Sequence, residues 1–249
     1  MLTAIISDIH GNLAALETVL ADLRAAGIER VVCLGDVAAT GPQPHQVIER
    51  LRLLKCPVVL GNTDEWLLNP QPDPHADAET QWFEAVDLWC AQQLAPSDLD
   101  FLRTFRPTIE VGLGDGSSLI AYHGSPRSNT EQIFPTLPDA DLKTALAGSS
   151  ATVLAGGHVH MQMIRRFEDM LVINPGSVGL PYEEIGGVAR NPPWAEYAVI
   201  NAEVNHLHVE LRRAIYDVRP TLEAAKTSGM PHAERWIKDW DVSNQGIHP

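Results

Sequence analysis

Residues 3–12, TAIISDIHGN, begin with a short apolar run and end in a polar cluster. The apolar run predicts a buried β-strand at the start of the chain. Residues 12–27 follow with apolar side chains at helical spacing and with a glycine that stops the helix. A second strand, a second helix and a third strand are predicted at residues 30–35, 44–55 and 57–62. Such a βαβαβ unit implies parallel strands that are joined by right-handed crossovers.

The second half of the chain is rich in strand patterns. Hairpins are predicted at residues 108–123, which include the turn GDG, and at residues 161–177 and 196–214. A helix (139–148) and a buried strand (within 151–160) are predicted between the first two hairpins. The whole layout predicts the α/β class, as a four-layer αββα sandwich of two mixed β-sheets flanked by helices.

Two segments differ from this alternation. Residues 66–107 predict a small helical insertion, or cap, that contains a proline-rich loop, two helices and three tryptophans for core packing. Residues 215–249 predict a C-terminal helical tail. No internal repeat or linker divides the chain, so residues 1–249 are expected to form a single domain.

The composition excludes some partners. Lys and Arg number 18 and Asp and Glu number 32, so the net charge is −14. An acidic surface argues against binding of nucleic-acid polymers or anionic membranes, which need a basic face. No apolar stretch approaches the roughly 18 residues of a membrane span, and no basic leader precedes the first strand, which predicts a cytoplasmic protein. The sequence makes no prediction about oligomeric state.

Five fragments share one pattern, in which an apolar strand ends in a short polar cluster. In open α/β sheets, ligands bind in the crevice beyond the carboxyl ends of the strands. Because residues i and i+2 of an extended segment point the same way, each D-x-H or H-x-H pair is expected to face one ion from a single strand end. The side chains that these fragments supply are Asp8, His10, Asp36, Asn62, His123, His158 and His160.

The chemistry of this set indicates a metal site. Two carboxylates, one amide oxygen and four imidazoles suit borderline divalent metals better than Ca²⁺, which prefers oxygen ligands alone. Seven ligands are too many for one tetrahedral ion, but they suit two ions that share a bridging carboxylate. We therefore expect two divalent transition-metal ions, Mn²⁺ first, with Fe, Zn²⁺, Co²⁺ or Ni²⁺ as alternatives.

The motifs also identify a family. D-x-H, G-D, G-N, H and G-H-x-H, from Asp8 to about Ser177, resemble those of the calcineurin-like metallophosphoesterases. The resemblance implies that Asp8, His10 and His160 hold one ion, that Asn62, His123 and His158 hold the other, and that Asp36 bridges them. It also implies that Asn62 stabilises charge on the phosphoryl oxygens. The tail is similar to that of bacterial diadenosine-tetraphosphatase-like members.

Position 63 departs from the family pattern G-N-H-[DE]. Thr63 stands where relatives have a histidine that is a candidate general acid, while Asp64 keeps the carboxylate. Three explanations are open: the substrate has an easily departing leaving group; another acid serves, such as Asp64, a metal-bound water or His75; or the protein is a non-catalytic scaffold. The complete set of ligands favours a working enzyme, because a scaffold does not need it.

Two further residues are candidates for substrate binding. Asn12 begins the first helix, whose N-terminus suits an anion, and Arg127 in HGSPRS follows His123 closely enough to pair with a phosphate. The sequence thus predicts an enzyme that hydrolyses phosphodiester or phosphoanhydride bonds of small substrates, nucleotides among them. The alternatives are a phosphomonoesterase and a metal-binding or protein-binding scaffold.

Overall fold

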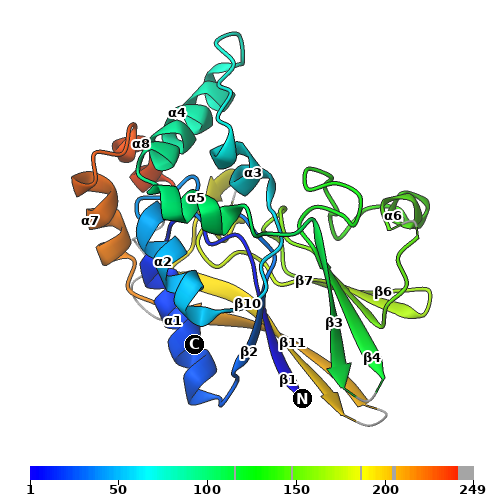
Figure 1. Cartoon of the computed structure of the whole chain (residues 1–249). Helices are drawn as coiled ribbons and strands as arrows, with labels where there is room; N and C mark the ends of the chain where they lie inside the picture. Colours follow the sequence, from blue (N-terminus) through cyan, green and yellow to red (C-terminus); the bar gives the residue numbers. More distant parts are fainter. Residues whose placement is uncertain (115, 147, 186, 204–205, 241–249) are drawn as a thin grey trace.

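The computed structural model describes residues 1–114, 116–146, 148–185, 187–203 and 206–240. It has the predicted α/β fold, with two mixed sheets flanked by helices (Figure 1). The first sheet has the strand order β11-β10-β1-β2. Its strands are β1 (Leu2–Ile6), β2 (Arg30–Cys33), β10 (Trp194–Glu203) and β11 (His206–Ile215). β1 runs parallel to β2 and antiparallel to β10, so the sheet is mixed.

The second sheet has the order β3-β4-β5-β7-β6. Its strands are β3 (Thr108–Gly114), β4 (Ser117–Tyr122), β5 (Val153–Ala155), β6 (Met163–Phe167) and β7 (Met170–Asn174). β4, β5 and β7 are parallel, and antiparallel strands flank them. A separate small ribbon pairs β8 (Glu183–Ile185) with β9 (Val188–Arg190). The middle residue of the predicted GDG turn lies outside the described residues.

Alternating side chains of β1 serve two different cores. Ile5 packs between the two sheets with apolar residues of both, such as Ala121 and Ile200. Ala4 and Ile6 point the opposite way, toward α1 (Leu13–Ala25) and α2 (Pro44–Leu54). On the far side, α6 (Asp139–Ala145) packs its Leu142 against the second sheet. Figure 1 shows α1 and α2 on one side of the sheets and α6 on the other, which gives four layers.

The insertion and the tail pack on the same side as α1. The insertion contains three helices, α3 (Asn62–Leu68), α4 (Ala78–Gln92) and α5 (Pro96–Leu102), and the described part of the tail contains α7 (Arg219–Thr227) and α8 (Ala233–Lys238). α8 lies beside α4 in Figure 1, and Arg235 stacks 4.3 Å from the centre of the Trp82 ring. Residues 241–249 of the predicted tail lie outside the described residues. None of the helices described here is long and apolar enough to cross a membrane.

Two sequence predictions needed correction. Residues 57–62 do not form a full strand: Val58 and Val59 make only isolated bridges, to Cys33 and Arg106. The insertion has one more helix than predicted, because the G-N-T-D motif itself begins α3. Both differences have one cause: α3 begins at Asn62, so the chain leaves the extended conformation directly after these bridges.

Candidate metal centre

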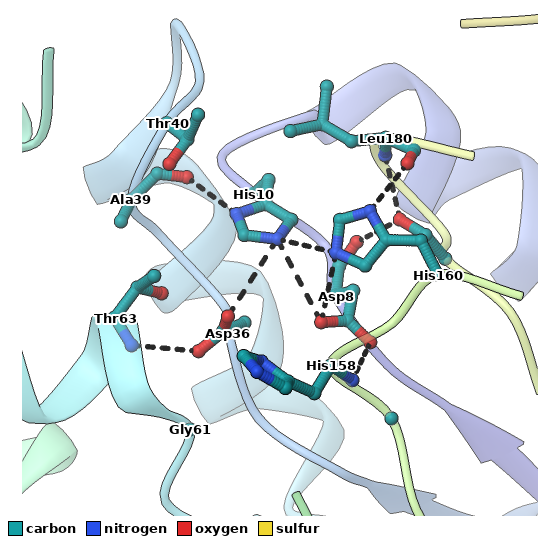
Figure 2. Close-up of polar contacts among 12 residues, drawn as sticks. Asp8, His10, Asp36, Ala39, Thr40, Gly61, Thr63, His158, His160 and Leu180 are labelled. Atoms are coloured by element: carbon teal, nitrogen blue, oxygen red, sulfur yellow. Dashed lines mark hydrogen bonds and ion pairs between the residues drawn. The ribbon is translucent and has the colours of Figure 1, made fainter. Parts of the chain in front are cut away.

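Three of the predicted ligands form a tight group beyond β1 and β5. His160 Nε2 lies 3.2 Å from Asp8 Oδ1, and His10 Nε2 lies 3.2 Å from His160 Nε2. Figure 2 shows the two imidazoles and the Asp8 carboxylate pointing toward one another. These ligand atoms all lie within 4.8 Å of each other, close enough to hold one cation.

Asp36, His123 and His158 form a second group with the same spacing. His123 Nε2 lies 3.3 Å from Asp36 Oδ2 and 3.0 Å from Asn62 Oδ1, so the amide oxygen joins this group. Asp36 Oδ2 is also 3.9 Å from His10 Nε2, which belongs to the first group. One carboxylate oxygen therefore faces both groups.

At most of these ligands the backbone is left-handed rather than extended. Five of them have positive φ: Asp8 (55°), His10 (46°), Asp36 (52°), His158 (68°) and His160 (55°). A non-glycine residue in this region costs about 1–3 kcal/mol and persists only where the surroundings enforce it. The expectation that extended strand ends would present i and i+2 together was thus wrong in its geometry. Asp8 and His10 do share a group, but His158 and His160 belong to different ones.

Two glycines allow the loops to approach. A Cβ on Gly61 would lie 2.1 Å from Asp36 Oδ1, and a Cβ on Gly157 would lie 2.1 Å from Ser7 Oγ and 2.7 Å from Asp8 Oδ2. None of these three distances is compatible with a side chain at either position. Glycine at these positions therefore places the backbone directly against the two carboxylates.

Backbone carbonyls fix the orientation of three imidazoles. The Nδ1 atoms of His10, His123 and His160 lie 3.1, 2.8 and 2.7 Å from the carbonyl oxygens of Ala39, Leu34 and Leu180, respectively. A carbonyl oxygen only accepts, so each Nδ1 must carry the proton. Nε2 of each ring then faces the carboxylates, which is the usual arrangement of a metal-binding histidine.

This arrangement fits a cation. His160 Nε2 lies 3.2 Å from His10 Nε2 and 3.2 Å from Asp8 Oδ1, so three potential ligand atoms converge on one point. Burial, together with His160, lowers the pKa of His10 to about 4, so its Nε2 stays unprotonated at neutral pH. For His123, burial acts to lower the pKa, but Asp36 and Asp8 outweigh it and raise the pKa to about 10. The carboxylates thus attract positive charge to the site.

The segment that contains all the candidate ligands also identifies the family. A family model described as the calcineurin-like phosphoesterase superfamily domain matches residues 1–200. The chain belongs to this superfamily. The predicted resemblance is confirmed, and membership makes the protein a metal-dependent phosphoesterase, a hydrolase whose family uses divalent metal ions.

Similar proteins match almost the whole length of the chain. The uncharacterized protein MJ0912 of Methanocaldococcus jannaschii is 28% identical over 245 residues, which cover 92% of this chain and 93% of that protein. A metallophosphoesterase from Sphaerobacter thermophilus superposes with a TM-score of 0.75 at 24% identity and covers 96% of this chain and 97% of its own. The hypothetical protein PH1004 from Pyrococcus horikoshii OT3 reaches 0.78 at 22% identity, with 95% and 96% covered. These two structures support the fold alone.

The Asp64 side chain does not face the two groups of candidate metal ligands. It is fully buried, and its oxygens accept hydrogen bonds from the backbone N–H groups of Asp36 (2.8 Å), Val37 (2.9 Å) and Gly61 (3.1 Å). Burial and then the Asp36 carboxylate raise the pKa of Asp64 to about 7. Even so, both oxygens point to the backbone, so the side chain ties the Asp36 loop to the start of α3.

The two predicted substrate-binding residues are engaged elsewhere. Asn12 is fully buried: its Nδ2 donates to Gly179 O (2.9 Å) and Tyr216 Oη (2.8 Å), and its Oδ1 accepts from the N–H of Ala15 (3.1 Å). Arg127 is half-exposed and turns its guanidinium to Glu131, with 2.7 Å between Nε and Oε2. Asn12 therefore caps α1 and joins it to the tail, and Arg127 forms a surface ion pair.

A third group of potential ligands was not anticipated from the sequence. His45, Glu49 and Asp98 lie within coordinating distance of one another, between α2 and α5. Asp98 is already occupied, because it accepts from Arg52 (2.9 Å), from His45 (2.6 Å) and from the N–H of Ala95 (2.9 Å). The group therefore joins two helices.

Proposed function

We propose that the protein is a dinuclear phosphoesterase that hydrolyses phosphodiester or phosphoanhydride bonds of small substrates. The observation that carries this proposal is the position of Asp36, whose Oδ2 faces His10 on one side and His123 on the other. Asp8, His10 and His160 would hold one ion, and Asn62, His123 and His158 the other. When bound, such ions activate a water as nucleophile and neutralise charge that develops on phosphate oxygens.

The residues of the chain orient and hold the reacting groups. Backbone carbonyls keep Nε2 of three histidines available as ligand atoms. Asn62 turns its amide oxygen to His123, and its amide nitrogen would donate to a phosphoryl oxygen. We assign Asp64 a positioning role, because it holds the backbone on both sides of Asp36.

The preferred leaving group follows from the absence of an acid at position 63. A threonine hydroxyl is too weak an acid to protonate a poor leaving group at neutral pH. Both oxygens of Asp64 accept hydrogen bonds from backbone N–H groups, so they do not face a substrate. His75 lies in the exposed loop between α3 and α4. Loss of general-acid catalysis costs about 10²–10⁴ in rate, and it penalises poor leaving groups most. Diesters with good leaving groups and phosphoanhydrides are therefore the expected substrates.

A substrate panel tests this function. Purified protein with Mn²⁺ should cleave bis-p-nitrophenyl phosphate and a dinucleoside polyphosphate, and Asp36→Asn should abolish both activities. If p-nitrophenyl phosphate is the far better substrate, the phosphomonoesterase alternative holds. If the protein binds two ions but is inert toward the whole panel, it is a scaffold.

A further inference from the structure

The loop between β2 and α2 carries the carbonyl that orients His10. Ala39 O accepts the Nδ1 proton of His10 at 3.1 Å, and Thr40 follows with a φ of 66° (Figure 2). Positive φ is strained for any β-branched residue. The Thr40 backbone therefore needs contacts that hold it, and these contacts also hold the neighbouring Ala39 carbonyl.

Two segments outside the sandwich supply these contacts. Trp236 of α8 is buried, and its indole Nε1 donates to Thr40 O at 2.8 Å. The Thr40 hydroxyl donates to Asp87 Oδ1 of α4, also at 2.8 Å. From the same face of α4, Cys90 Sγ donates to Gly41 O at 3.4 Å. The tail and the insertion thus form hydrogen bonds to three groups of one short loop: the Thr40 carbonyl, the Thr40 hydroxyl and the Gly41 carbonyl.

We propose that Trp236 and Asp87 are positioning residues for His10. By fixing Thr40 on both sides, they place the Ala39 carbonyl where it selects the Nδ1–H form of His10 and directs Nε2 toward Asp8 and His160. Trp236 lies beyond residues 1–200, which the family model matches, so this support comes from outside the family domain. The inference rests on the proposed function in taking His10 as a metal ligand.

The rival explanation is that Trp236 only packs. Its ring lies 5.4 Å from that of Trp240, and the adjacent Arg235 stacks on Trp82, so α8 has aromatic contacts besides the indole hydrogen bond. The two explanations assign different importance to one group, the indole N–H of Trp236. Packing depends on the ring, whereas positioning depends on the N–H group.

Trp240 offers a matched control. It is 4% exposed, much like Trp236 at 2%, but its Nε1 is buried without a hydrogen-bond partner among the described residues. Phenylalanine removes the same atoms at either site, but only Trp236→Phe removes a hydrogen bond to the loop. Both variants are made in the full-length chain, and thermal unfolding shows how much packing each has lost.

The first readout is titration of the metal-free protein with Mn²⁺. Ligand-orienting partners of metal-bound histidines typically contribute 10–100-fold in affinity. Since Trp236 acts through Thr40 and Ala39, we expect Trp236→Phe to weaken one of the two Mn²⁺ sites by about tenfold and to leave the other unchanged. Trp240→Phe should leave both sites unchanged.

The second readout needs no metal. Long-range ¹H–¹⁵N spectra of metal-free protein report which ring nitrogen of each histidine carries the proton. Wild type and Trp240→Phe should show the Nδ1–H form of His10, whereas Trp236→Phe should show a mixture at His10 alone. Asp87→Ala should behave like Trp236→Phe, and Asp87→Asn, which still accepts from Thr40, should restore the wild-type form.

The outcomes distinguish failure of the proposed function from failure of the positioning role of Trp236. If wild type binds no Mn²⁺, the proposed function fails, while the spectra still test the positioning of His10. If Trp236→Phe and Trp240→Phe give the same His10 spectrum, Trp236 is a packing residue and the inference is overturned.

Discussion

At the residue scale, Thr63 sets this chain apart from the pattern that its family suggests. Its backbone N–H donates to Asp36 Oδ1 at 3.0 Å, which places it at the edge of the metal centre. Its hydroxyl is buried and has no hydrogen-bond partner in the part of the chain that the structure describes. An unpaired buried hydroxyl is unfavourable, so the Thr63 hydroxyl does not stabilise the fold through a hydrogen bond.

Thr63→His should restore general-acid catalysis. We expect rates to rise by about 10²–10⁴ for phosphomonoesters with poor leaving groups, because only these need protonation. Hydrolysis of bis-p-nitrophenyl phosphate should change little. Steady-state kinetics on both substrates test this, with Thr63→Gln as a control of similar size that transfers no proton. Equal rates in all three proteins would mean that another acid already serves.

The residue types of the centre were predictable from the motifs, but the atoms that orient them were not. D-x-H and G-H-x-H identify side chains by chemistry, and the structure brings these side chains together. The orienting groups at Ala39, Leu34 and Leu180 are backbone carbonyls, which every residue has. The start of the first helix suggested Asn12 as a substrate contact, but the local sequence does not reveal its hydrogen bonds to Gly179 and Tyr216, far along the chain.

At the scale of elements, the centre is built from loops that meet at very close range. Gly61 precedes α3 and lies against both the backbone nitrogen and the carboxylate of Asp36. Its φ of −76° suits any residue, so space alone requires glycine here.

Gly61→Ala should therefore displace Asp36. Overpacking of this kind costs about 1–3 kcal/mol of unfolding free energy, and we expect binding of both Mn²⁺ ions to weaken because Asp36 faces both groups. Denaturant unfolding and Mn²⁺ titration measure the two effects. Gly112→Ala is the control, since a Cβ there meets no described atom within 4 Å. Unchanged metal binding in Gly61→Ala would contradict the bridging position of Asp36.

The contact between α4 and the Thr40 loop predicts a pH effect on stability. Burial raises the pKa of Asp87 to about 7; Thr40 lowers it, and the charges of Asp36 and Glu84 raise it further. Between the unfolded value of 3.8 and about 7, the folded protein holds one proton more than the unfolded chain. Stability from this group is thus present below pH 4 and is lost as pH rises to about 7.

Asp87→Asn removes this dependence, because it cannot ionise. Relative to wild type, the variant should gain unfolding free energy as pH rises from 4 to 7, on the order of 3 kcal/mol at about 1.4 kcal/mol per pKa unit. Urea unfolding of both metal-free proteins at several pH values measures the difference. A difference that stays constant with pH would show that Asp87 is charged throughout.

The elements themselves were largely predictable, and the exceptions have a physical cause. Apolar periodicity identified the two sheets and the helices outside them, because burial on one face decides those patterns. It missed the left-handed turns after β1 and β5 and the early start of α3. These features depend on contacts between loops that are distant in sequence, and local patterns do not encode such contacts.

At the scale of the whole molecule, one hydrophobic core joins the sandwich to the added segments. Leu16 of α1, Val86 of the insertion and Leu222 of the tail belong to the same cluster of buried residues. We therefore propose that the chain is a single domain and expect one cooperative unfolding transition, with equal calorimetric and van't Hoff enthalpies. Two separate transitions in differential scanning calorimetry would show that the tail or the insertion unfolds independently.

Because the protein is acidic overall, binding of an anionic substrate needs a local positive charge at the candidate metal centre. The chain carries a net charge of −14, yet the proposed substrates are anions. The two divalent cations of the proposed centre would exceed the combined charge of Asp8 and Asp36 by about two units, which would attract a phosphate against an acidic surface.

The central claim is that two metal ions share Asp36. Anomalous diffraction from crystals soaked in Mn²⁺ tests it most directly. We predict two peaks, one bound by Asp8, His10 and His160 and the other by Asn62, His123 and His158, with the Asp36 carboxylate in contact with both. A single peak that Asp36 does not touch, or no peak among these side chains, would contradict the account.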